Sequence, residues 1–214
     1  MTNSIGYYGD SGQSASNSAY WQDLYDSPGE WGRSYFDAAH NFVASYIYEL
    51  PYGKGKKYGS HVNPIANGFL SNWQVSGILS LRSGFPITIT ALDKSGTTSR
   101  GARANCIGPS DGNHAVGLGA FWFNTSVFSQ PTSGFGSCGN NTVVGPGLRE
   151  FDLGVQKQFP VTESKRFEFR AEFINLTNTP IFNAPSRSVT STTFGEVTGS
   201  QGARNIQFGL KFYF

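Results

Sequence analysis

The sequence ends in Arg204-Asn-Ile-Gln-Phe-Gly-Leu-Lys-Phe-Tyr-Phe214, a stretch that alternates strictly between apolar and polar side chains. In an extended strand, alternate side chains point to opposite faces. One face therefore carries Ile206, Phe208, Leu210, Phe212 and Phe214, and the other carries Asn205, Gln207, Gly209, Lys211 and Tyr213. About ten residues with one apolar face and aromatic ends match a tilted strand that crosses an outer membrane. We expect this stretch to be such a strand.

Three upstream segments show the same alternation, at about residues 39–50, 151–159 and 166–175. In the last of these, the charged residues Glu168, Arg170 and Glu172 share one face and aromatic residues share the other. An arginine facing lipid near the midplane would cost about 2–4 kcal/mol. The aromatic face is therefore predicted to be the one that is buried or faces lipid.

Residues 72–92 form the longest periodic segment, because their apolar residues stay in phase straight through Ser83 and Gly84. A turn would normally reset that phase, so one long strand with a glycine kink is favoured. A hairpin stays open as an alternative, since Gly84 and Pro86 are also turn residues.

The connections between these segments alternate in length. Residues 160–165 form a short connection, whereas residues 93–149 and 176–203 are long and show little periodicity. Outer-membrane barrels have short periplasmic turns and long outside loops. Residues 1–37 read as a further loop with one short strand near residues 4–8. We therefore expect an all-β fold, an antiparallel meander of five or six strands with long extracellular loops.

Five or six strands are fewer than the ~8 needed to close the smallest membrane barrel. The whole chain, residues 1–214, is accordingly expected to be one partial barrel, the C-terminal part of a larger one. Residues 1–8 show no export signal, and no run of ~20 apolar residues occurs. The chain is thus expected to be either cytoplasmic or the tail of a longer exported protein.

Composition narrows the function. Charged residues make up 14% of the chain, against roughly 25% in ordinary soluble domains, while aromatic residues reach 15% and there are 27 glycines. This is a strand-rich composition with long polar loops. The net charge of +2 is small and its basic residues are scattered, so nucleic acid is excluded as a partner.

Cys106 and Cys138 are the only cysteines, and both lie in a loop-like region rich in Gly, Ser and Asn. A disulfide between them would close about thirty residues and contribute ~3–4 kcal/mol to loop order, which suggests an oxidising compartment. Two free surface thiols are the alternative. The three histidines, His40, His61 and His114, have no metal-ligand spacing, so we expect no metal, no cofactor, no catalytic residues and no enzyme activity.

Several strings, in this order, resemble the C-terminal barrel region of Oar-like TonB-dependent receptors. They are Phe42-Val-Ala-Ser-Tyr-Ile-Tyr-Glu-Leu-Pro-Tyr-Gly-Lys-Gly-Lys56, Asn72-Trp-Gln-Val-Ser-Gly-Ile78, Ser83-Gly-Phe-Pro86, Gly145-Pro-Gly147, Phe167-Glu-Phe-Arg-Ala-Glu-Phe-Ile-Asn175 and the terminal Phe214. The resemblance covers nearly everything from Trp31 onward. It implies that the chain is roughly the last five strands of a barrel of about twenty-two, without the plug and N-terminal domain of that family.

The resemblance also implies a function, namely the capture of a scarce small solute outside the cell and its import through the outer membrane. An inner-membrane TonB complex would supply the energy by acting on the plug, and outer-membrane lipid would surround the barrel. The long loops would contribute to capture, with Phe121, Trp122, Phe123 and Phe128 as candidate contacts. A loop folded on its own aromatic cluster is the alternative for these four residues.

The terminal strand resembles the signal that the barrel assembly machinery recognises, a final aromatic residue preceded by apolar residues at every second position. That role would fall to Ile206, Phe208, Leu210, Phe212 and Phe214. An alternative to the whole interpretation is a secreted β-sandwich that binds carbohydrate or a cell surface. A sandwich packs its apolar face against a second sheet, whereas a membrane barrel leaves that face bare to lipid.

Overall fold

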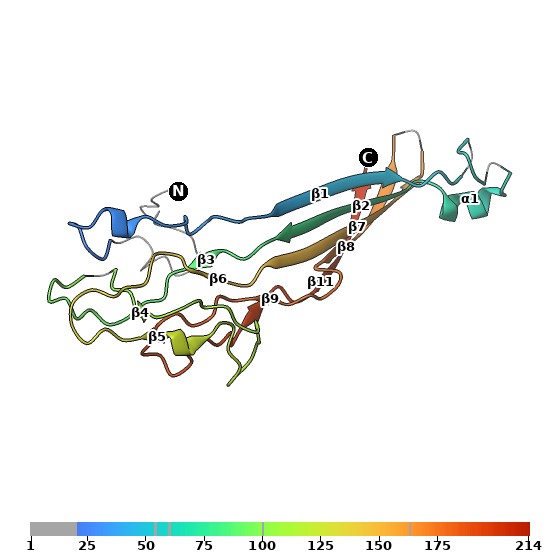
Figure 1. Ribbon diagram of the computed structural model, residues 1–214. Coiled ribbons are helices and arrows are strands. Elements are labelled where there is room, and N and C mark those ends of the chain that lie inside the picture. Colours follow the sequence, from blue (N-terminus) through green and yellow to red (C-terminus); the bar gives the residue numbers. More distant parts are fainter. Residues whose placement is uncertain (1–20, 54, 60, 100, 163) are drawn as a thin grey trace. The chain divides into compact units, whose positions relative to one another are not determined.

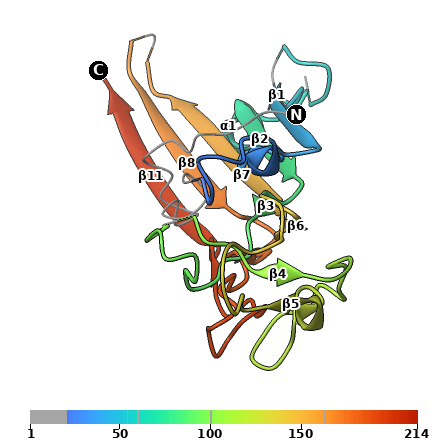
Figure 2. The ribbon, with the colours of Figure 1, turned by 60° about the vertical axis from the view of Figure 1, so that its left-hand side comes forward.

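The computed structural model describes residues 21–214 apart from residues 54, 60, 100 and 163. The chain divides into two compact units. The sheet unit comprises Asn41–Leu81, Arg149–Pro180 and Gly202–Phe214, and the loop unit comprises Met1–His40, Arg82–Leu148 and Ile181–Gln201. Figures 1 and 2 show their elements. The expected short strand near residues 4–8 lies outside the described residues.

The sheet unit is built on five long strands in the order β1-β2-β7-β8-β11 (Figure 2). Their lengths of 9 to 13 residues suit a tilted membrane crossing, which needs about 9–11. The expected all-β antiparallel meander is thereby confirmed, along with four of its strands, whose bounds lie within three residues of those expected. The five strands are β1 (Asn41–Glu49), β2 (Trp73–Arg82), β7 (Leu148–Pro160), β8 (Arg166–Ile174) and β11 (Asn205–Tyr213).

The register of β8 against its neighbours places the apolar residues of three strands in shared rows. Phe167 pairs with Phe159 of β7 and with Phe212 of β11, and Phe173 pairs with Leu153 and Ile206. The tyrosine ring of Tyr46 lies over Gly77, which puts the apolar residues of β1 and β2 on one side of their pair as well. One face of the sheet is therefore apolar from strand to strand, because each strand alternates and the register keeps the rows aligned.

The connection between β1 and β2, residues 50–72, contains a short helix that the sequence pattern did not predict. Helix α1 (Pro64–Leu70) begins after Asn63, whose side-chain oxygen accepts a hydrogen bond from the Ala66 N–H at 2.7 Å. Asparagine at the N-cap followed by proline at the first helical position is a strong start signal. The helix has only seven residues and contains Gly68, so its apolar pattern is too short to be recognised as periodic.

The long loops fold into a unit of their own, although their sequence shows little periodicity. Among its described residues, the loop unit forms three small two-stranded antiparallel sheets and two 3-10 turns. The pairs are β3 (Pro86–Ile87) with β6 (Val143–Val144), β4 (Asn105–Cys106) with β5 (Phe128–Ser129), and β9 (Ile181–Phe182) with β10 (Ser200–Gln201), and the turns are η1 (Pro28–Glu30) and η2 (Thr125–Val127).

The expectation of one strand through residues 72–92 is wrong, and the hairpin alternative is not observed either. Strand β2 ends at Arg82, and the chain then enters β3, which pairs with β6 rather than with β2. Gly84 lies against the backbone of Gly145, so its lack of a side chain serves a close approach of two chain segments. Apolar residues continue beyond β2 in the sequence because β3 is buried in the loop unit, not because β2 continues.

The core of the loop unit joins residues that are far apart in the sequence. Phe123 makes edge-to-face contacts with Phe128 and Phe194 at centroid distances of 5.6 and 5.4 Å. These contacts anchor segments that have no strand periodicity, which is why the sequence pattern did not reveal them. The buried members are Ile87, Ile89, Ala104, Phe123, Phe128, Cys138 and Val143.

A buried ion pair holds residues 22–30 to the rest of the loop unit. The Arg103 guanidinium donates to Glu30 Oε2 at 2.6 Å, and both side chains are at most 5% exposed. Gln22 joins the same network, because its amide nitrogen donates to the Gly136 carbonyl and its oxygen accepts from the Arg103 N–H. Buried charges need such partners, and here the partners come from three separate segments.

Candidate functional site

Large apolar side chains on one face of the long sheet are exposed, whereas a carboxylate on the opposite face is covered. Phe208 and Leu210 of β11 are 69% and 70% exposed, whereas Glu168 on the opposite face of β8 is 3% exposed. A water-soluble sheet would show the reverse. The apolar face is bare, as a lipid-facing surface is, and it is not packed against a second sheet as the sandwich alternative requires.

An aromatic row crosses the apolar face near the connection at residues 161–165. Phe159, Phe167 and Phe212 are consecutive partners on β7, β8 and β11, and the rings of Phe167 and Phe212 lie 4.6 Å apart. Phe214 continues the row, with its ring 6.0 Å from that of Phe212. Girdles of aromatic residues mark the membrane–water interfaces of outer-membrane barrels.

The opposite face of β8 and β11 carries a network of charged and polar side chains. Glu168 accepts hydrogen bonds from Arg170 at 2.5 Å and from the Tyr213 hydroxyl at 3.3 Å. Glu172 accepts from the Gln207 amide at 2.6 Å. Because every one of these side chains lies on the face away from the exposed aromatics, this face is suited to line the interior of a barrel.

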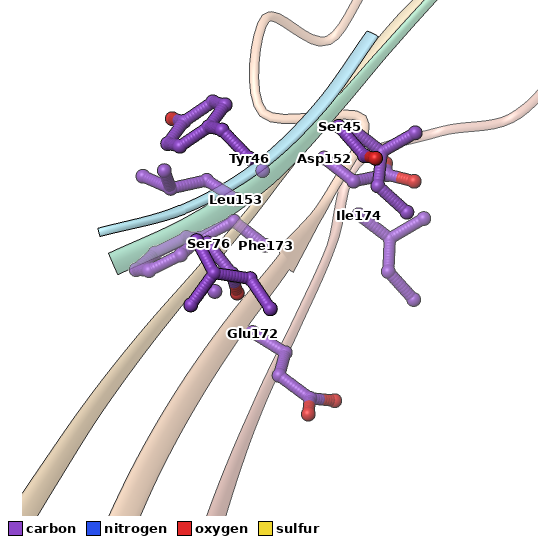
Figure 3. A pocket seen from close by; sticks show the side chains of 12 residues that line it. Ser45, Tyr46, Ser76, Asp152, Leu153, Glu172, Phe173 and Ile174 are labelled. Carbon is purple, nitrogen blue, oxygen red and sulfur yellow. The ribbon is translucent and has the colours of Figure 1, made fainter. Parts of the chain in front are cut away.

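This interior face is not polar throughout. A hollow of about 640 Å³ lies against β1, β2, β7 and β8 (Figure 3). Tyr46 and Leu153 lie on one side of the strands in this view, and Glu172 and Ile174 lie on the other. Three aliphatic residues on the interior side of the hollow are substantially exposed, with fractions of 72%, 47% and 39% for Ile47, Ile78 and Ile174, respectively.

The loop unit contains a second hollow, of about 530 Å³. Its walls combine exposed apolar side chains, among them Tyr25 and Leu24, with the hydroxyl groups of residues 97–99. Ser99 Oγ donates to the Gln22 carbonyl at 3.1 Å, which ties the two walls together. Volumes of this order and mixed aromatic and polar walls are typical of small-molecule sites. The lining residues are Trp21, Gln22, Asp23, Leu24, Tyr25, Thr97, Thr98, Ser99 and Phe135.

The four aromatic residues singled out as candidate ligand contacts fall in different places. Phe123 and Phe128 are buried in the core of the loop unit, as in the alternative of a loop folded on its own aromatic cluster. Trp122 packs against that core, its indole N–H donates to the Val144 carbonyl at 2.8 Å, and its ring lies 4.7 Å from that of His114. Phe121 is 48% exposed and keeps an open surface.

Cys106 and Cys138 are brought together, but both are free thiols in this structure. Burial raises the pKa of the Cys138 thiol, and a hydrogen bond to Cys106 adds to that shift. Cys106 follows Asn105 at the pairing of β4 with β5, so the small sheet fixes one partner of the pair. The predicted disulfide remains a prediction.

Within the described part of the chain, no group of three or more His, Cys, Asp or Glu side chains could hold a metal ion. No helix in that part is long and apolar enough to cross a membrane.

The sequence patterns did not single out Ile47, Ile78 and Ile174 or the wall at residues 21–25 as functional residues. Apolar residues on the nominally polar face of β1 were visible as an imperfect alternation, and that imperfection was the available signal. The wall at residues 21–25 gave no periodic signal, because hydrogen bonds from distant segments set its shape.

Comparison with known proteins agrees with a sheet whose apolar face is exposed. The family model described as "Outer membrane beta barrel domain" matches residues 2–207. No curated protein and no solved structure shows a significant match to the chain. The family match and the exposed aromatic face lead to the same conclusion. The chain belongs to the outer membrane beta barrel domain family and is a protein of the outer membrane.

Proposed function

We propose that this chain is the C-terminal barrel segment of a TonB-dependent receptor that captures a scarce solute and imports it. The ordered strings between Phe42 and Phe214 that resemble Oar-like receptors support this assignment. In this proposal the chain contributes barrel strands, outside loops and an assembly signal to the receptor, and it has no catalytic role.

The open sheet edges support a larger barrel. Among the described strands, β1 has only β2 as a neighbour and β11 has only β8. Unpaired backbone groups cannot face lipid without a large cost, so a sheet in the membrane has to close on itself. Five strands are fewer than the ~8 of the smallest barrels. Further strands must pair with β1 and β11.

The aliphatic patch formed by Ile47, Ile78 and Ile174 is the observation that favours a plugged receptor over an open pore. A water-filled channel is lined by polar residues. These three side chains lie on the same face as Glu172 and are exposed to at least 39%. Apolar side chains in a barrel interior are stable when protein fills that interior, as a plug does.

The hollow at Trp21 and Tyr25 is the proposed place of capture. The side chain of Gln22 is 6% exposed and bonded to Gly136 and Arg103, so the wall is held in place before a ligand arrives. A preformed wall lowers the entropy cost of binding. Exposed aromatic rings beside hydroxyl groups suit an organic solute with both apolar and polar parts.

Energy-coupled import can be tested in the source cells by comparing three strains. One strain lacks this protein, one lacks the inner-membrane energy-coupling complex, and one lacks neither. We expect at least one solute to remain in the medium of both mutant strains and to be consumed by the third. A solute that depends on this protein but not on the coupling complex would indicate a passive pore and contradict the proposal.

The pocket can be tested in the same assay with the paired variant Trp21→Ala/Tyr25→Ala. Consumption of the identified solute should fall in this variant, because the aromatic walls are gone. Leu118→Ala is a control for the loss of an exposed apolar side chain, since Leu118 is an 83% exposed residue of the loop unit that does not line the hollow. Equal loss in both variants would argue against capture at this hollow.

The plug can be tested by placing a photo-crosslinking amino acid at position 47 or 78 of the protein in its native outer membrane. We expect the label to join a protein segment inside the barrel. The same label at Leu210, on the lipid face, is the control and should give no such product. If positions 47 and 78 also capture no protein, the interior is open and the receptor assignment fails.

A further inference from the structure

Helix α1 presents apolar side chains that nothing in the described structure covers. Ile65 and Phe69 are 77% and 67% exposed, and Leu70 is 46% exposed. Ile65 and Phe69 stand four residues apart and therefore share one face of the helix. An exposed cluster of large apolar side chains marks a surface that contacts a partner or a membrane.

The position of α1 in the chain places it at one end of the sheet. It belongs to residues 50–72, which connect β1 to β2, and antiparallel strands bring this connection to the same end as residues 161–165 (Figure 1). The much longer connections, residues 83–147 and 175–204, leave from the opposite end. Since the long loops of outer-membrane barrels face outward, α1 lies on the periplasmic side.

Two contacts fix the C-terminal end of α1 to the lipid-facing side of the sheet. The indole N–H of Trp73 donates to the Phe69 carbonyl at 2.7 Å, and the Lys157 ammonium donates to the Ser71 carbonyl. Ser71 is the C-cap residue of α1. Trp73 lies on the same face as Gly77, the face that Tyr46 covers, and Lys157 lies on the same face as Phe159.

Lys157 is a basic residue within the apolar face of β7, between Val155 and Phe159. It is 1% exposed, and its ammonium lies 5.0 Å from the centre of the Phe159 ring and 5.5 Å from that of Trp73. A lysine near the end of a membrane span directs its charge toward the interface and keeps its alkyl stem among apolar groups. Here the charge reaches the end of α1, so the lysine holds the helix at the interface.

We propose that α1 is an interfacial foot, a short helix whose Ile65, Phe69 and Leu70 insert into the phospholipid headgroup region of the periplasmic leaflet. Its contacts with Trp73 and Lys157 make it continuous with the lipid-facing surface of the sheet. Lys57, which follows β1 in the same connection, adds positive charge that complements lipid phosphates. A helix of seven residues is too short to span the bilayer and lies along its surface.

The test is spin-label accessibility in the protein carried by its native outer membrane. Single labels are placed by Ile65→Cys, Phe69→Cys and, as a matched control, His61→Cys, in a Cys106→Ser/Cys138→Ser background. His61 is exposed and lies just before α1, whereas Leu210→Cys gives the reference for a residue immersed in lipid. Collisions with oxygen report lipid, and collisions with a water-soluble nickel complex report water.

We expect a higher oxygen-to-nickel ratio at positions 65 and 69 than at position 61, approaching the ratio at position 210. If positions 65 and 69 are as accessible to nickel as position 61, the helix lies in water and the proposal fails. If they are inaccessible to both reagents, a periplasmic protein covers the helix and the proposal fails equally.

A second variant tests the link to Lys157. Lys157→Met keeps most of the side-chain stem but removes the ammonium, so the label at position 65 should lose part of its oxygen accessibility. Lys165→Met is the control, because Lys165 is an exposed lysine at the same end of the sheet and its loss changes the net charge equally. An unchanged label in Lys157→Met would overturn the role given to this lysine.

Discussion

Gly84 and Gly145 lie so close together that a Cβ atom on Gly84 would stand 1.7 Å from the Gly145 carbonyl oxygen. The Gly145 N–H donates to the carbonyl of Phe85, the residue that follows Gly84, at 2.9 Å. Gly147 is similarly close to Arg82, with 2.6 Å between a Cβ and the Arg82 oxygen. Two short strings that are distant in the sequence thus meet backbone to backbone.

The first prediction follows from this contact. Gly84→Ala should destabilise the loop unit by about 1–3 kcal/mol or more, because no flexible side chain can move away from the added methyl group. The measurement is the rate at which a protease cleaves the loops of the intact protein in its membrane. Gly108→Ala is the control, since a Cβ there meets only Val127 at 3.8 Å. Equal cleavage of both variants would contradict the close approach.

The second prediction concerns the buried pair of Arg103 and Glu30. Arg103→Ala leaves a buried carboxylate without its cation and should cost about 3–5 kcal/mol in the loop unit. Arg33→Ala breaks the exposed pair with Asp37 and should cost less than about 1 kcal/mol. The two losses of stability are measured by thermal unfolding of the loop unit, with protease sensitivity as the readout. Similar losses of stability in both variants would show that the buried ion pair contributes no more to stability than the exposed one.

The third prediction concerns Cys106 and Cys138, whose side chains are close enough to share a hydrogen bond. In an oxidising compartment we expect them to form a disulfide, which would stabilise the loop unit by ~3–4 kcal/mol. Alkylation of the denatured, unreduced protein followed by mass spectrometry measures it. The expected result is no alkylation before reduction and two alkylated cysteines after it. Two alkylated cysteines without reduction would contradict the bond.

The fourth prediction is a pH dependence in the loop at Asp93. Hydrogen bonds from the Ser95 hydroxyl and from backbone N–H groups lower the pKa of the Asp93 carboxyl below its usual 3.8. The charged carboxylate therefore stabilises the turn at pH values above 3.8, and this contribution is lost as the pH falls through the lowered pKa. Hydrogen exchange at the Ser95 and Ser99 amides should accelerate relative to neighbouring amides only at the acidic end.

Asp93→Asn is the control for this dependence, because an amide oxygen still accepts hydrogen bonds but does not titrate in this range. The variant should show no acidic acceleration of its own. If the wild-type protein and Asp93→Asn respond alike to acid, then Asp93 is not the responsible group.

The fifth prediction concerns the terminal strand as an assembly signal. Phe214→Ser should lower the amount of folded protein in the outer membrane, measured by heat-modifiable gel mobility. Lys211→Ser is the control, because Lys211 lies on the opposite face of β11 and pairs with Glu168. Equal folded amounts for Phe214→Ser and wild type would contradict an assembly role of the final residue.

The sequence by itself determined the long strands and their faces. Alternation is a local property, so β1, β7, β8 and β11 followed from it, and the charge of Arg170 decided which face of β8 turns away from lipid. The same alternation, with aromatic residues on the apolar faces of β8 and β11, predicted a membrane sheet before any contact was known.

Only the tertiary structure decided what the connections do. The core around Phe123, the ion pair between Arg103 and Glu30, and the contact of Gly84 with Gly145 join segments that are remote in the sequence and carry no period. Lys157 shows the same limit within a strand. The alternation of β7 places this lysine among apolar residues, and only its hydrogen bond to the Ser71 carbonyl shows why a lysine stands there. Periodicity records which way a side chain points, whereas a partner from a distant segment is fixed only when the chain folds.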